Sequence, residues 1–137
     1  MATIQLTGIL EDGSPRGALV PKDARQVLRV TKSVDYTIRV SVQTSSGSPV
    51  AITGTTYALA VRKTNESGAL VINPALVGAV NLQLGTNVVE FTLTDTQTRN
   101  LVPGIYLYDV LRVTGAGLRD IVIPTSAFYL SSTPGRN

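Results

Sequence analysis

The hydrophobic and polar positions alternate with a period of two residues along several parts of the chain. The segments 35–42 and 56–63 show this most clearly. Their apolar side is formed by Tyr36, Ile38, Val40 and Val42 in the first segment and by Tyr57, Leu59 and Val61 in the second. Such alternation is typical of strands with one buried face. Both segments are therefore predicted to be strands.

Further short segments rich in branched residues continue this pattern. The additional predicted strands are 26–31, 69–72, 88–93, 104–113 and 120–130, with Pro124 marking an edge position or a bulge in the last one. Residues 94–100 suit one helical turn, whereas 75–87 suit either a short strand or a loop that crosses between sheets. Turn signals recur about every 8–12 residues, which predicts an all-β sandwich of about seven or eight strands.

The pattern divides the chain into three parts. Residues 1–25 include a possible strand at 3–10 and a turn-rich stretch, and are predicted to be an N-terminal arm or an extra hairpin. That arm either moves freely or docks on a neighbouring subunit. Residues 26–131 form the sandwich, and 132–137 are expected to be a loose tail.

The segment around Tyr106 has the spacing of a tyrosine corner. In Greek-key sandwiches this Tyr begins the penultimate strand, and its hydroxyl bonds to backbone a few residues upstream. Pro103 and Gly104 would make the sharp entry to the strand, and Leu101 would fill the core before it. These four residues are the predicted fold signature.

The strand that follows the corner is apolar on both faces. With Tyr106 pointing inward, the opposite face carries Ile105, Leu107, Asp109, Leu111 and Val113. One face of an antiparallel sheet commonly meets water, so this outer face is more apolar than solvation requires. We expect three of its residues, Ile105, Leu107 and Leu111, to contact a partner protein. The alternative is that they are ordinary scattered apolar residues on the surface.

Composition limits the chemistry that the chain can perform. The 137 residues include no His and no Cys, which removes the commonest general base and the thiol nucleophile. The acids lack the spacing of a calcium loop. Asp109 and Asp120 flank one predicted hairpin, where they suit either a glycosidase pair or, in the favoured interpretation, a solvated or salt-bridged rim. We expect no catalytic, cofactor-binding or metal-binding residues.

Charge and hydropathy limit the partners. The net charge is only +3 and the basic residues are scattered, which does not indicate a nucleic-acid partner. No apolar stretch of about 18 residues is present, and the N-terminus lacks the features of a signal peptide. We therefore expect synthesis in a cytoplasm and no membrane contact.

The order of motifs resembles the immunoglobulin-like domains of tailed-bacteriophage virion proteins. The most specific part is T-x-x-L-x-P-G-x-Y-x-Y-D, present here from Thr98 to Asp109. The resemblance covers about residues 26–130 and includes baseplate upper-protein N-terminal domains and small tail or head accessory proteins. It implies an immunoglobulin-like Greek-key β-sandwich.

The same resemblance implies a non-enzymatic structural role in a virion. The partners would be other virion proteins and copies of the chain itself, in a symmetric assembly of many copies. The alternative function is a carbohydrate- or host-surface-binding module on the same fold. Sugar sites usually use exposed aromatic residues, whereas Tyr36, Tyr57 and Tyr129 are predicted to lie in or near the core.

Overall fold

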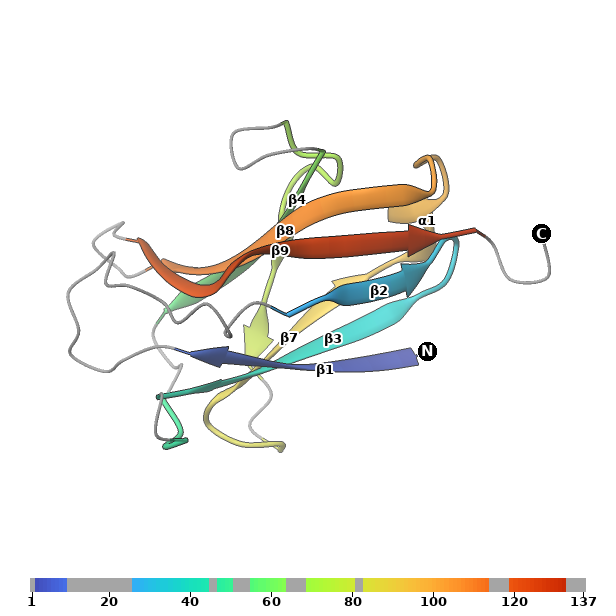
Figure 1. The fold of residues 1–137 in the computed structure, drawn as a ribbon. Helices are drawn as coiled ribbons and strands as arrows, with labels where there is room; N and C mark the ends of the chain where they lie inside the picture. Colours follow the sequence, from blue (N-terminus) through green and yellow to red (C-terminus); the bar gives the residue numbers. More distant parts are fainter. Residues whose placement is uncertain are drawn as a thin grey trace.

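The protein is a sandwich of two β-sheets with one short helix (Figure 1). The computed structural model describes residues 2–9, 26–44, 47–50, 55–63, 69–80, 83–113 and 119–132, except for the side chain of Arg119. Nine strands lie within these ranges. The structure therefore confirms the expected all-β sandwich.

Sheet A contains four strands in the order β1-β3-β7-β6. They are β1 (Ala2–Ile9), β3 (Tyr36–Gln43), β7 (Val88–Leu93) and β6 (Ala79–Val80). The pairing of β1 with β3 is parallel, whereas β7 pairs antiparallel with both β3 and β6.

Sheet B contains five strands in the order β2-β9-β8-β4-β5. They are β2 (Leu28–Thr31), β9 (Arg119–Ser131), β8 (Gly104–Val113), β4 (Thr56–Arg62) and β5 (Leu76–Val77). The first pair, β2 with β9, is parallel, and the other pairs are antiparallel. Immunoglobulin-like sandwiches likewise pack a four-stranded sheet against a second sheet with three central strands, which here are β9, β8 and β4.

The N-terminal strand differs from the expected organisation. Residues 1–25 were predicted to be an arm or an extra hairpin, but β1 is an edge strand of the sandwich itself. Leu6 is buried in the core and Ile4 packs against it, which explains why the strand docks. The predicted boundary at residue 25 therefore does not separate an arm from the sandwich. Residues 10–25 and 133–137 lie outside the described ranges.

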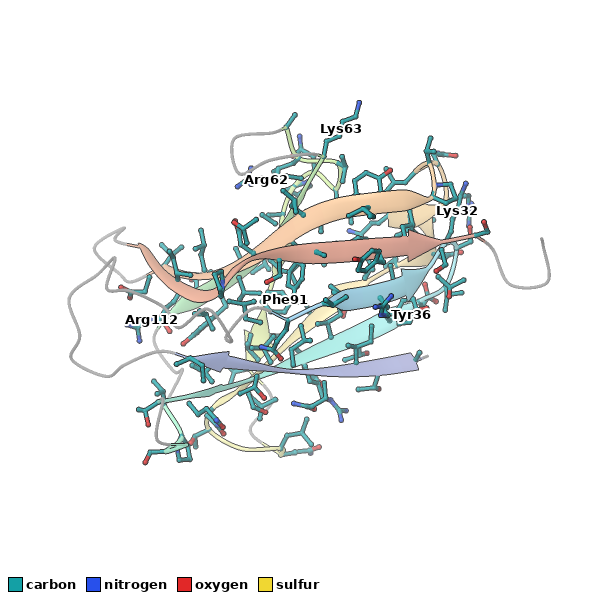
Figure 2. All side chains as sticks on the ribbon, viewed as in Figure 1. Lys32, Tyr36, Arg62, Lys63, Phe91 and Arg112 are labelled. Carbon is teal, nitrogen blue, oxygen red and sulfur yellow. The ribbon has the colours of Figure 1, made fainter. Side chains whose placement is uncertain are left out.

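The core is built from the alternating apolar positions. Each buried residue of β3 is followed by a partly exposed one along the whole strand. Phe91 of β7 lies near the middle of the molecule in Figure 2 and is completely buried, as is Phe128 of β9. Tyr36 and Tyr57 are also core residues, as predicted.

The chain crosses from sheet B to sheet A at Gly78, between β5 and β6. Its N–H donates to the carbonyl of Tyr57 at 2.8 Å. A Cβ at this position would lie 2.3 Å from Cγ2 of Val89, so only glycine fits without displacement of the core. The segment 75–87, which suited a strand or a crossing loop, thus contains both.

The last strand bends at a bulge. The register between β8 and β9 shifts between Tyr108 and Leu111, opposite the part of β9 that contains Pro124. Pro has no N–H to donate to the ladder. Because a bulge leaves one residue without a ladder bond, Pro124 fits there without loss of a hydrogen bond. This confirms one of the two positions predicted for Pro124.

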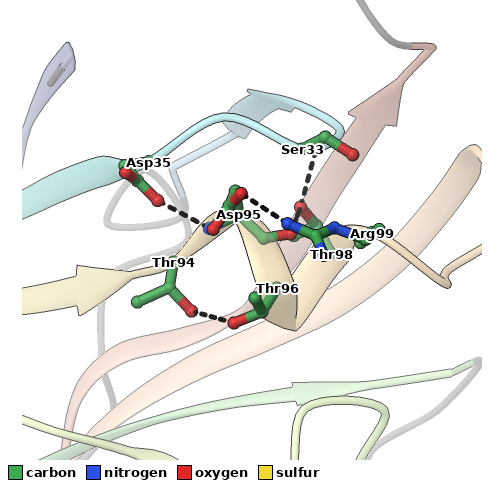
Figure 3. Close-up of polar contacts among 7 residues, drawn as sticks. All are labelled: Ser33, Asp35, Thr94, Asp95, Thr96, Thr98 and Arg99. Atoms are coloured by element: carbon green, nitrogen blue, oxygen red, sulfur yellow. Dashed lines mark hydrogen bonds and ion pairs between the residues drawn. The ribbon is translucent and has the colours of Figure 1, made fainter.

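The short helix α1 (Asp95–Thr98) lies near one end of the sandwich (Figure 1), and Figure 3 shows its polar contacts. The N–H of Asp95 donates to Oδ1 of Asp35 at 2.7 Å, and the N–H of Ser33 donates to Oγ1 of Thr98 at 2.9 Å. Arg99 forms an ion pair with Asp95 at 2.8 Å. These contacts fix α1 to the turn between β2 and β3 and set the starting point of the following corner.

Candidate functional site

The corner that begins β8 is held by one hydrogen bond. The Tyr106 hydroxyl donates to the carbonyl of Val102 at 2.6 Å, four residues upstream. This is the contact that defines a tyrosine corner. The N–H of Leu101 donates to Thr98, and its side chain packs against the core. Gly104 has a φ of +157°, a conformation that side chains rarely adopt.

The Tyr106 ring is only partly buried. It packs edge-on against Phe128, with ring centroids 6.3 Å apart, while its hydroxyl is exposed. The four residues of the predicted fold signature, Leu101, Pro103, Gly104 and Tyr106, thus lie together at one end of the sandwich. They fix which side chains of β8 point inward.

The outer face of β8 carries the predicted contact residues. Tyr108 and Val110 are buried on the inner face. Ile105 is 63% exposed on the other side, and Leu107 and Leu111 are half-buried there. The structure places all three on one face of sheet B.

The strand register extends this face across the sheet. Ile105 lies opposite Tyr129 of β9, which in turn lies opposite Arg29 of β2. The Arg29 guanidinium stacks over the Tyr129 ring at 4.7 Å from its centroid. Side chains of these types carry much of the binding energy in protein interfaces.

Further apolar side chains continue the face along the strands. Leu111 lies between Ala58 of β4 and Ile121 of β9, which is 40% exposed. We call the outer surface of sheet B at these positions the sheet B face. It consists of Arg29, Ala58, Ala60, Arg62, Ile105, Leu107, Asp109, Leu111, Ile121, Ala127 and Tyr129, so that two further charged side chains, Arg62 and Asp109, lie among the apolar ones.

A groove of about 350 Å³ lies beside Leu107 on this face. Its walls come from the segment before β2, from β8 and from β9, and consist of Gln26, Val27, Leu107, Thr125, Ser126 and Ala127. Val27 is 48% exposed at its edge. The groove is a depression in the sheet B face that could receive an apolar side chain of a partner protein.

The outer face of sheet A is of opposite character. Its positions on β1, β3 and β7 are mostly polar, with Ile9 and Val88 as the apolar exceptions. The polar ones include Thr3, Gln5, Thr7, Thr37, Arg39, Ser41, Glu90 and Thr92. Arg39 and Glu90 form an ion pair across the strands at 2.6 Å. Sheet A therefore has the surface expected of a sheet that meets water. The two faces of one molecule differ in hydrophobicity.

Three residues of the sheet B face, Tyr129, Arg29 and Ile121, were not predicted from the sequence to lie on it. Tyr129 was expected in or near the core, but it is half-buried on the outer surface because its neighbours Phe128 and Leu130 point inward. The alternation of these three residues was the available signal. Arg29 and Ile121 join the face only through the strand register, which no local pattern reveals.

The candidate carboxylate pair is not brought together. Asp120 is buried and bonded to Arg112, whose Nη2 lies 2.7 Å from Oδ2. Asp109 lies on the outer face of the same sheet. The two acids thus occupy opposite faces of sheet B, and the salt-bridge interpretation holds for Asp120. Figure 2 shows Arg112 at the opposite end of the molecule from Lys32.

Two buried tyrosines have perturbed ionisation. Burial raises the pKa of Tyr108 well above its ordinary value, and its hydroxyl donates to the carbonyl of Gln26 at 2.5 Å. Burial also raises the pKa of Tyr57, although the nearby Arg112 opposes the shift. Both phenols therefore stay protonated at neutral pH and serve as structural groups.

The described ranges contain neither a cluster of metal ligands nor a membrane-spanning helix. No group of three acidic side chains gathers there in a way that could hold a metal ion. No helix in those ranges has the length and hydropathy to cross a membrane.

Comparison with known proteins gives a likeness of fold. No family model matches the sequence, and no curated protein matches it. Among solved structures, the N-terminal domain of phage TP901-1 ORF48 aligns over 96% of this chain and 99% of its own, with a TM-score of 0.50 and 10% identity. PbICP-C, solved in complex with falcipain-2, aligns over 97% and 100% with a TM-score of 0.45 and 11% identity. The chain thus shares its sandwich fold with a domain of a phage protein.

Proposed function

We propose that this protein is a non-enzymatic structural component of a bacteriophage virion. It would be a tail, baseplate or head accessory or decoration protein that assembles through the sheet B face. The observation that carries the proposal is the difference between the two outer faces. Sheet A is polar and ion-paired, whereas sheet B presents Ile105, Tyr129 and Ile121 to the surface.

The energetics of the sheet B face suit a protein partner. Full burial of an aliphatic side chain contributes about 1.5–3 kcal/mol, and Ile105 still exposes 63% of its surface. Tyr129 and Arg29 add a preformed aromatic and cationic pair next to it. A face of this kind gains free energy when another protein covers it.

The virion setting is supported by two separate observations. The motif from Thr98 to Asp109 resembles those of phage virion domains, and its tyrosine forms the expected corner. The fold is shared with a domain of a phage protein over nearly the whole chain. The partners are other virion proteins and copies of this chain, repeated by the symmetry of the particle.

Incorporation into particles tests the proposal. Ile105→Asp would place a charge within the proposed contact, at its most exposed apolar residue on β8, and Thr92→Asp would place the same charge on the exposed polar face of sheet A. We expect mass spectrometry of purified virions to detect the wild type and Thr92→Asp at similar levels and Ile105→Asp at least tenfold lower. Absence of the wild type from virions would refute the virion role. Equal incorporation of both variants would refute the contact face.

One observation favours the alternative of a carbohydrate-binding module. Tyr129 is an aromatic residue on the outer surface rather than in the core, and sugar sites commonly use such rings. However, Arg29 already covers one face of this ring. A glycan array with the wild type and Tyr129→Ala decides: retention that depends on Tyr129 would favour the sugar site, and no retention would leave the assembly role as the better proposal.

A further inference from the structure

The outer edge of β1 has open backbone groups. Among the described residues, β1 is the last strand of sheet A and pairs only with β3. In a parallel pair, alternate residues direct their N–H and C=O groups toward the partner strand, and the others direct them away. Thr7 bonds on the side away from β3, so Thr3 and Gln5, which share its alternation, also point outward.

The side chain of Gln26 occupies one place on this edge. Its Oε1 accepts from the N–H of Thr7 at 2.8 Å, and its Nε2 donates to the carbonyl of Thr7. A carboxamide offers one carbonyl acceptor and one N–H donor, as a strand residue does. It therefore binds where one residue of an additional strand would bind.

Gln26 is itself fixed by sheet B. Its N–H donates to Oγ of Ser126 at 3.2 Å, and its carbonyl accepts from the Tyr108 hydroxyl at 2.5 Å. Within residues 2–7, and against the part of the chain that the structure describes, the edge of β1 is thus closed at Thr7 and open before it. The open groups belong to Thr3 and Gln5, which lie symmetrically on either side of Ile4.

The open part of this edge lacks the usual protection against strand pairing. Natural edges are commonly blocked by charges, proline or a bulge. The segment 2–6 is Ala-Thr-Ile-Gln-Leu, which has no charge and no proline, and its register with β3 is continuous. Ile4 and Leu6 face the core, whereas Thr3 and Gln5 are exposed on the outer face.

We propose that β1 pairs antiparallel with β1 of a second copy of this chain, about a two-fold axis that passes beside Ile4. In this register Thr3 of one copy exchanges hydrogen bonds with Gln5 of the other, and the two Ile4 residues lie opposite each other. The two sheets A then form one continuous sheet of eight strands. Apolar inner positions meet apolar ones, and polar outer positions meet polar ones.

Two features favour a second copy as the occupant. A two-fold axis places residues of the same charge near each other, which destabilises pairing wherever the edge is charged. The segment 2–6 has no charge, so self-pairing carries no such cost. The Gln26 amide also limits the open groups to a stretch that is symmetric about Ile4. This contact is separate from the sheet B face, so it stands or fails independently of the virion role.

Cysteine cross-linking tests the register, since the natural chain has no cysteine. Ile4 would form a non-hydrogen-bonded pair with its counterpart, with Cα atoms about 4.5 Å apart, which a disulfide can span. We expect purified full-length Ile4→Cys to form covalent dimers under mild oxidation. Thr92→Cys, on the exposed face of β7, should give none above background. A mixture of Thr3→Cys and Gln5→Cys should cross-link more than either variant alone.

Sedimentation equilibrium tests whether the edge holds the dimer. Gln5→Pro removes an outward N–H without loss of a bond to β3, because proline is tolerated on the open side of an edge strand. We expect the wild type to dimerise and Gln5→Pro to be at least tenfold weaker, with an unchanged circular dichroism spectrum. Should Gln5→Pro fail to fold, the cross-linking register decides instead.

Three results would overturn the self-pairing. They are a wild type that stays monomeric at millimolar concentration, a dimer that Gln5→Pro leaves equally strong, and purified Ile4→Cys that forms no more covalent dimer than Thr92→Cys. None of the three would affect the incorporation test of the sheet B face.

Discussion

Three tyrosine hydroxyls bond to backbone groups of a neighbouring segment. The Tyr36 hydroxyl accepts from the N–H of Thr31 at 2.7 Å, Tyr106 donates to Val102, and Tyr108 donates to Gln26. In each case a phenol satisfies a backbone group that the strand ladders do not. The three bonds differ in burial, and so should differ in their contribution to stability.

The buried bond should matter more than the one that identifies the corner. Tyr108 is 1% exposed, so Tyr108→Phe leaves the Gln26 carbonyl without its donor, at a cost of about 1–3 kcal/mol. The Tyr106 hydroxyl is exposed, and water replaces it in Tyr106→Phe, at a cost of about 0.5–1 kcal/mol. Urea unfolding of both variants measures the difference. A larger loss for Tyr106→Phe would contradict this ranking.

Alkaline pH should unfold the protein through the same buried phenols. The pKa of Tyr108 and that of Tyr57 are raised in the folded state, so the unfolded chain loses these protons first as the pH rises. Stability is therefore constant with respect to these groups below about pH 10 and falls above it, by up to about 1.4 kcal/mol per pH unit for each tyrosine. Urea midpoints between pH 8 and 11.5 check this. Tyr108→Phe should reduce the slope, and an equal slope would exclude Tyr108 as a cause.

At this scale the sequence predicts local contacts better than distant ones. The Tyr106 corner follows from four residues that are close along the chain. The Tyr108–Gln26 bond joins residues 82 positions apart, and no spacing indicates it. Gln26 was predicted only as the first residue of a strand, although its backbone and side chain connect β1, β8 and β9.

At the scale of elements, the period-two pattern located the long strands but not their neighbours. It indicated β3, β4, β7, β8 and most of β9. The parallel pairs β1–β3 and β2–β9 depend on which edges meet in the folded chain. The predicted strand at 69–72 is reduced to a single bridge between Leu70 and Arg62, because the chain turns soon afterwards into β5.

Removal of β1 should destabilise the sandwich. Deletion of residues 2–9 exposes the β3 edge and removes Leu6 from the core, with an expected loss of roughly 2–4 kcal/mol. Leu6→Ala keeps the strand and should lose less. Thermal unfolding of both proteins measures the effect. An unchanged unfolding temperature for the deletion would mean that β1 behaves as the dispensable arm predicted from sequence.

The crossing between the sheets should tolerate only glycine. Gly78→Ala places a Cβ against Val89 and near the Phe91 ring, which should cost about 1–3 kcal/mol through overpacking. Val89→Ala alone creates a cavity, but combined with Gly78→Ala it provides room for the new methyl group. A double-mutant cycle by urea unfolding should therefore show a favourable coupling. Additive losses would argue against the contact.

At the scale of the whole molecule, association is expected to rest on apolar contacts and backbone hydrogen bonds. The net charge is only +3. Three ion pairs within the molecule, Arg39–Glu90, Arg99–Asp95 and Arg112–Asp120, neutralise part of the charge. On the sheet B face, Arg29 is stacked on Tyr129, and Arg62 and Asp109 add one charge of each sign. Charge attraction between copies therefore has a minor role.

Assembly should consequently resist salt. Screening at about 1 M salt shortens the reach of charges to about 3 Å but leaves hydrophobic burial intact. We expect the protein to remain on purified particles between 0.1 and 1 M NaCl, measured by sedimentation and gel analysis. Release at high salt, with a steep dependence on its concentration, would indicate phosphate contacts and contradict the apolar interface.

The parallel pairing of β2 with β9 also bears on the order in which the protein is made. Leu28 lies opposite Phe128, and among the described strands β2 has no other neighbour in sheet B. A ribosome must therefore synthesise another hundred residues or so before β2 obtains its partner, while β1 can already align with β3. Until then the apolar side chains of Leu28 and Val30 lack their final cover. Nascent chains that end before β9 should therefore depend on chaperones, and sheet B completes only after its last strand emerges.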